Sequence, residues 1–207
     1  MQTDKIKVRS DGSGRVSALD ETEKFAVYVG LNSENAMRVR LLAEETLGMV
    51  QSIVGDFEAE FWVESHNDGI CQMHLAATAD IDYDTKQALI DTSTRKRNEA
   101  SKGFMGMVRE LLEHGLYSTA DQGLHVSLMC GAAGLHGAGA APHAYMWSLE
   151  QFRSNIDEQQ EIDPEAHRFM HDLEKSIVAK IADDVKVSVD GDDVEMVIEK
   201  KFAELVK

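Results

Sequence analysis

The chain has 207 residues, and its 37 Asp and Glu against 21 Lys and Arg leave a formal net charge of −16. A surface this acidic repels a phosphate backbone, which excludes nucleic acid as a partner. Hydrophobic residues make up 43% of the chain, enough to form a folded core.

Cysteine content and hydropathy predict a cytoplasmic protein. The two cysteines, Cys71 and Cys130, are too few for a disulfide framework, so a reducing compartment fits best. The N-terminal residues 1–10 have no apolar signal core, and no later run is long and apolar enough to span a membrane. We therefore expect a soluble cytoplasmic protein with no membrane partner.

The first quarter of the chain is predicted to form a short strand and two helices. Alternation in residues 5–9 (KIKVR) predicts an edge strand, which the turn residues 11–14 (DGSG) end. Residues 20–31 fit a helix or a strand; a helix is favoured by the spacing of Phe25, Tyr28 and Val29, with Asp20 as N-cap. The next helix, over 33–54, is capped by Asn32 or Ser33, ends at Gly55 and buries one face: Ala36, Val39, Ala43, Leu47, Val50 and Val54.

An antiparallel pair of strands is predicted next. The strand over 57–65 alternates glutamates with Phe57, Ala59, Phe61 and Val63, and residues 67–69 (NDG) turn the chain. The return strand over 70–80 has its own apolar face of Cys71, Met73, Leu75, Ala77 and Ala79. An acidic strand end (80–84), a polar segment with a basic run at 95–97, and a helix over 103–114 follow.

The stretch over 122–149 has no charged residue and is rich in Gly and Ala, which predicts an irregular segment or a loop over a partner surface. We expect it to be mobile in the isolated chain and ordered on association, most simply in a homodimer. A helix is predicted over 148–162 and another from Asp163-Pro164, which buries Phe169, Met170, Leu173, Ile177 and Ile181. A terminal hairpin turns at 190–191 between two apolar sets: Val185, Val187 and Val189, then Val194, Met196 and Ile198.

Three segments resemble the histidine-kinase-like ATPases, in the branch of the anti-sigma-factor serine kinases. Residues 30–54 are similar to the family's long helix, where residues 41–49 (LLAEETLGM) stand at its Leu-Ala-x-Glu-Glu-Ala-x-x-Asn pattern. Residues 102–112 (KGFMGMVRELL) resemble the glycine-rich box and the helix behind it, and the terminal hairpin resembles the last two strands. The resemblance implies a single domain over 1–207 with an inserted glycine-rich and helical segment at 116–183. The implied fold is an α/β (α+β) two-layer sandwich, with a mixed or antiparallel sheet covered by helices on one face.

The resemblance also implies a nucleotide site. Glu45 falls on the family's catalytic glutamate, and Asp80 or Asp82 on the aspartate that binds the adenine amino group. Gly103 and Gly106, beside Lys102, would let backbone N–H groups approach the phosphates of ATP. A solvated helix glutamate and a solvated acidic turn are the alternatives for Glu45 and for the aspartates.

Departures from the family pattern predict a degenerate site. Met49 stands where the Mg²⁺-binding asparagine belongs, and a thioether is a poor ligand for Mg²⁺. The Asp-x-Gly-x-Gly motif is absent after the second strand, and residues 191–194 (GDDV) replace the glycine-threonine signature. We therefore expect ATP as the cofactor with little or no role for Mg²⁺, and weak or absent catalysis.

Two functions are compatible with these residues. One is an ATP-binding regulator of a protein partner, such as a sigma factor or a response-pathway protein. The other is a non-catalytic protein-interaction module that keeps the ATPase fold. A zinc set joining His167 and His171 to Cys130, His136 and His143 has no recognisable spacing, and no Gly-x-Ser-x-Gly elbow supports a serine hydrolase.

Overall fold

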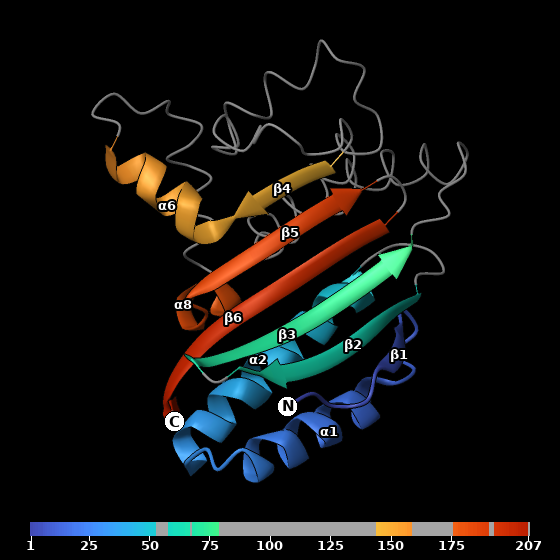
Figure 1. Ribbon diagram of the computed structural model, residues 1–207. Coiled ribbons are helices and arrows are strands. Elements are labelled where there is room, and N and C mark those ends of the chain that lie inside the picture. Colours follow the sequence, from blue (N-terminus) through green and yellow to red (C-terminus); the bar gives the residue numbers. More distant parts are fainter. Residues whose placement is uncertain (53–57, 67, 79–143, 159–175, 191–192, 207) are drawn as a thin grey trace.

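The computed structural model describes residues 1–52, 58–66, 68–78, 144–158, 176–190 and 193–206 (Figure 1). Their elements follow the chain in this order: β1 (Ile6–Arg9), α1 (Arg15–Tyr28), α2 (Ser33–Ser52), β2 (Glu58–Ser65), β3 (Asp68–Thr78), β4 (Ala144–Ser148), α6 (Leu149–Glu158), α8 (Ile177–Ile181), β5 (Asp184–Asp190) and β6 (Asp193–Val206).

The described strands form one antiparallel sheet in the order β1-β2-β3-β6-β5-β4. Helices α1 and α2 lie side by side against one face of this sheet (Figure 1). The terminal hairpin of β5 and β6 joins the sheet through β3, so it belongs to the same body as the first hairpin. The predicted α+β class, with an antiparallel sheet and helices against one face, is confirmed.

The core lies between the sheet and these helices, as the alternation in the sequence predicts. Met73 on β3 faces Val63 on one side and Ile198 on the other, which aligns the apolar positions of three strands. The four residues that we expected to be buried at this layer are at most 5% exposed: Phe61, Met73, Val187 and Met196.

Helix α2 matches its prediction closely. The Asn32 side chain accepts a hydrogen bond from the backbone N–H of Asn35 at 2.9 Å, so Asn32 is the residue that caps the helix. The predicted apolar face is buried at Val39, Ala43 and Leu47. The side chains of Val50 and Val54, and the predicted end at Gly55, lie outside the described residues.

Helix α1 begins five residues earlier than the sequence predicted, so Asp20 is not its N-cap. The cap is Gly14, which has a left-handed backbone with φ of 80° and leads directly from the turn after β1 into the helix. Phe25 is buried as expected, whereas Tyr28 is 76% exposed. The predicted start of the helix was too late because it relied on Asp20 as a side-chain cap. The helix instead follows the left-handed backbone of Gly14 and has no side-chain cap.

The end of the uncharged stretch is regular, which corrects the expectation of an irregular segment there. Ala144–Ser148 form β4, an edge strand paired with β5, and Leu149 begins α6. Trp147 is 1% exposed and contacts Phe152 of α6, with 6.1 Å between ring centroids. Burial of this large ring against the core favours the strand despite the glycines before it. Residues 122–143, on which the expected mobility depends, lie outside the described residues.

The helix predicted from residue 164 onward is described only at its end, as the single turn α8. Ser176 before it has an extended backbone (φ −71°, ψ 132°), so a helical phase cannot run through it into α8. Val178 and Ala179 are therefore the buried residues, and Ile177, expected to be buried, is 39% exposed. Phe169, Met170 and Leu173 lie outside the described residues.

Candidate functional site

The structure describes one of the six predicted site residues, Glu45. It lies on α2 and is half-buried, next to Thr46, which is 1% exposed and donates to the Leu42 carbonyl at 2.7 Å. The preceding residue, Glu44, points toward α1 and pairs with Arg15 at 3.4 Å. Glu45 therefore sits at the border of the buried face of α2, not on its fully exposed side.

The other predicted site residues lie outside the described residues, so their convergence with Glu45 stays a prediction: Asp80, Asp82, Lys102, Gly103 and Gly106. Met49 lies on α2, one helical turn after Glu45, and its side chain is not described. The chain leaves β3 at Thr78, two residues before Asp80.

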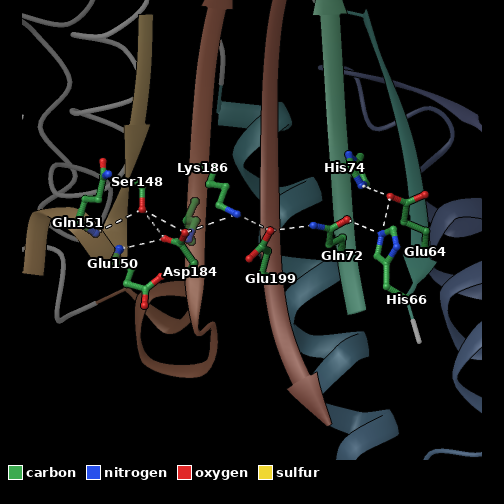
Figure 2. A network of polar contacts seen from close by, with 11 residues as sticks. Glu64, His66, Gln72, His74, Ser148, Glu150, Gln151, Asp184, Lys186 and Glu199 are labelled. Atoms are coloured by element: carbon green, nitrogen blue, oxygen red, sulfur yellow. Dashed lines mark hydrogen bonds and ion pairs between the residues drawn. The ribbon is translucent and has the colours of Figure 1, made fainter. Parts of the chain in front are cut away.

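A second group of polar residues lies on the sheet face turned away from α1 and α2, which we call the open face. Side chains on a strand alternate between the two faces, so the polar positions between the core residues all point there. Figure 2 shows a line of contacts crossing the sheet. Gln72 donates to Glu199 at 2.7 Å, and Lys186 pairs with the same carboxylate at 2.6 Å.

His74 is an enclosed polar residue of the open face, at 9% exposed. Its ring stacks on Trp62 of β2, with 4.5 Å between ring centroids and 6° between ring planes. Its Nδ1 lies 3.0 Å from Glu195 Oε1, and its Nε2 lies 3.1 Å from Glu64 Oε1. The same Glu64 oxygen lies 3.1 Å from His66 Nε2 (Figure 2).

A hollow of about 530 Å³ lies on the open face beside this histidine. Ala76 and Ser188 line it with small side chains, which leave this space above the sheet, and Glu195 lines it as well. The remaining charged lining residues are Lys7, Glu58, Glu60 and Asp193. Hydrogen bonds from Lys7 and Arg9 hold the pKa of Glu58 below its ordinary value. The hollow is thus lined by carboxylates that already have cationic or hydroxyl partners within the sheet.

A third polar cluster joins β4, β5 and α6. Asp184, 4% exposed, accepts hydrogen bonds from the Ser148 hydroxyl at 3.0 Å and from the backbone N–H of Glu150 at 2.9 Å. Ser148 in turn accepts from the backbone N–H of Gln151 at 3.3 Å. These contacts satisfy free N–H groups in the first turn of α6, so the cluster is structural.

Sequence reasoning missed the open-face network although its residues are visible as polar positions in the strands. The glutamates of β2 entered the prediction only as the positions that alternate with its apolar residues. Nothing in the order of residues shows that His74 meets Glu64 and Glu195, because that depends on the pairing of β3 with both β2 and β6. The available signal was a histidine at an outward position between two strands rich in glutamate.

Metal ligands and membrane spans were both sought among the described residues. These residues contain no group of three His, Cys, Asp or Glu side chains that could hold a metal ion. They also contain no helix with the length and apolar character needed to cross a membrane.

No protein-family model, no curated protein and no solved structure matches the chain.

Proposed function

We propose that this chain is an ATP-binding regulatory protein with a histidine-kinase-like ATPase fold and a degenerate nucleotide site. It binds ATP or ADP with little dependence on Mg²⁺, and it has weak or no catalytic activity. Its partner is a protein of a signalling or sigma-factor pathway in the cytoplasm, and the chain acts as a monomer or a homodimer.

The observation that carries this proposal is the arrangement of the two hairpins around α2. The resemblance requires a long helix, a strand pair and a terminal strand pair in one sheet, with the helix across one face. In this chain β6 pairs directly with β3, and α2 packs against the same sheet. A terminal hairpin in a separate body would have contradicted the resemblance, since the family places its last two strands in the central sheet.

The position of Glu45 gives additional support. A glutamate that activates water or a hydroxyl must reach a cleft while staying anchored by its own helix. Glu45 is half-buried beside the packed residues Leu42 and Thr46, which hold that part of α2 against the core. A solvated helix glutamate, the alternative interpretation, would be expected on the exposed side of α2, where Met37 is 70% exposed.

Thermal denaturation with ATP, ADP and a non-nucleotide polyanion such as tripolyphosphate tests the proposal. A ligand at a hundred times its Kd adds about 2.7 kcal/mol to the free energy of unfolding, which raises the melting temperature by several degrees. We expect ATP and ADP to produce this rise and tripolyphosphate to produce less. Equal, negligible shifts with all three ligands would contradict nucleotide binding.

A second candidate, a non-catalytic protein-interaction module, is favoured by exposed apolar side chains at the corner between α1 and α2. Val27 and Tyr28 are 77% and 76% exposed, and Met37 is 70% exposed. Large apolar side chains in water are a common feature of surfaces that bind proteins. This candidate predicts that no nucleotide shifts the melting temperature.

A further inference from the structure

His74 is bound by carboxylates at both ring nitrogens. Glu64 on β2 and Glu195 on β6 approach from the strands on either side of β3, at 3.1 Å and 3.0 Å. Because Glu64 and His74 are offset in the register, the three residues cross the sheet diagonally. The histidine therefore connects three adjacent strands through side chains alone.

The hydrogen-bonding chemistry of the ring makes this connection depend on a proton. An ionised carboxylate only accepts hydrogen bonds, so both contacts are satisfied when both ring nitrogens carry hydrogen. A neutral imidazole has one N–H, and its second nitrogen then presents a lone pair to a carboxylate oxygen. The doubly protonated ring also carries a positive charge over the face of Trp62, where a cation is stabilised.

The remaining charged groups around the ring come from every neighbouring strand. Lys5, before β1, lies over the Trp62 ring at 4.2 Å and pairs with Glu60. His66 shares the Glu64 oxygen. Lys186 lies on β5, on the far side of β6 from the ring, and it pairs with Glu199. Among the described groups, Glu64 and Glu195 are the ones in direct contact with the nitrogens of His74.

We propose that His74 is a proton-dependent clamp that ties β2 to β6 across β3 on the open face. In the doubly protonated state it holds Glu195 against the ring. Loss of one proton releases one of the two carboxylates, and Glu195 is the more readily released because its side chain is 43% exposed against 23% for Glu64. Release adds an unpaired negative charge to the wall of the hollow that Glu195 lines.

Glu195→Gln is the variant that tests the clamp, because it removes one charged partner at a half-exposed position and keeps the size of the side chain. Its matched control is Glu60→Gln, which removes a carboxylate that lines the same hollow and pairs with Lys5 instead of a histidine. Melting temperatures of the wild type and both variants are measured between about pH 5 and pH 8, the range in which histidine side chains change their protonation state.

With both ring nitrogens protonated, both carboxylates accept a hydrogen bond, whereas the neutral ring can donate to only one, so the contact with Glu195 should contribute more at the acid end of this range. The melting temperature of the wild type should be higher than that of Glu195→Gln at the acid end. We expect this difference to be about 2–4 °C larger there than at the alkaline end. The difference in melting temperature between the wild type and Glu60→Gln should stay constant over this pH range. Nitrogen-15 shifts of the His74 ring at the acid end should show two protonated nitrogens. Parallel melting curves for wild type and Glu195→Gln, or a singly protonated ring throughout, would overturn the proposal.

Discussion

Asp184 on β5 accepts a hydrogen bond at 2.9 Å from the backbone N–H of Glu150, in the first turn of α6. The cap of this helix therefore comes from a strand 34 residues further along the chain, and it fixes α6 to the edge of the sheet. The Ser148 hydroxyl completes the arrangement by donating to the same carboxylate at 3.0 Å.

Asp184→Ala is expected to destabilise the protein by about 2–3 kcal/mol. The substitution leaves the N–H of Glu150 and the Ser148 hydroxyl without their acceptor in a buried place, which costs more than the loss of an exposed hydrogen bond. Urea denaturation measures the change. Asp20→Ala, at an exposed position within α1, is the control, and we expect it to stay within about 0.5 kcal/mol of the wild type.

Two glycines are expected to respond in opposite directions to substitution by alanine. A Cβ added to Gly14 would lie 1.9 Å from the Lys7 carbonyl oxygen, and Gly14 has a φ of +80°. We therefore expect Gly14→Ala to cost about 2 kcal/mol or more. At Gly48, inside α2, an added Cβ meets nothing within 4 Å, so Gly48→Ala should stabilise the protein by up to about 1 kcal/mol. A loss of stability at Gly48, or none at Gly14, would contradict this account.

Alternating patterns in the sequence predicted the strands well because one face of each strand is buried. Phe61, Met73 and Val187 had to point to the same side, and a shift by one residue would have exposed all of them. The same argument did not find β4, because the glycine- and alanine-rich residues before it indicated an irregular segment and the burial of Trp147 depends on its contacts in the folded protein. Nor could it find the start of α1, which depends on the backbone conformation of Gly14 and its close contact with β1.

The candidate sites differ in how much the sequence could predict. Glu45 was proposed from a local motif on one helix, and its role at a nucleotide site stays a prediction. The clamp at His74 requires the order of three strands, two of which are separated by more than a hundred residues. Local patterns carry no information on such a pairing, so only the assembled sheet brings these side chains together.

Glu45→Gln should separate binding from catalysis at the proposed nucleotide site. If the chain hydrolyses ATP at a measurable rate, we expect that rate to fall by about 100-fold or more, because a glutamine cannot accept a proton. The shift in melting temperature caused by ATP should be retained. The neighbouring Glu44→Gln removes the ion pair with Arg15 and should leave the hydrolysis rate within about twofold. Equal effects of the two variants would exclude Glu45 from a catalytic role.

Nucleotide affinity is expected to change less than about tenfold between EDTA and millimolar Mg²⁺, because Met49 offers sulfur where Mg²⁺ requires oxygen. Calorimetric titration of ATP under both conditions measures the ratio of the two dissociation constants. Met49→Asn, which supplies an amide oxygen one turn after Glu45, is the matching variant and should make binding stronger with Mg²⁺ than with EDTA. A strong Mg²⁺ dependence in the wild type would show that other residues hold the ion.

Cys71 provides a test of the core that is independent of the nucleotide site. Burial at 1% exposure raises the pKa of its thiol from 9.0 to about 12, because the thiolate cannot be hydrated there. In a Cys130→Ser background, Cys71 should therefore resist labelling by iodoacetamide at pH 8 and become reactive in urea.

The raised pKa of Cys71 also makes the stability of the folded protein depend on pH. Above pH 9 the unfolded thiol releases its proton while the folded one keeps it, so stability falls as pH rises, by about 1.4 kcal/mol per unit at most. Cys71→Ala should lack this component, and equal alkaline slopes in the two proteins would show that the thiol is hydrated in the folded state.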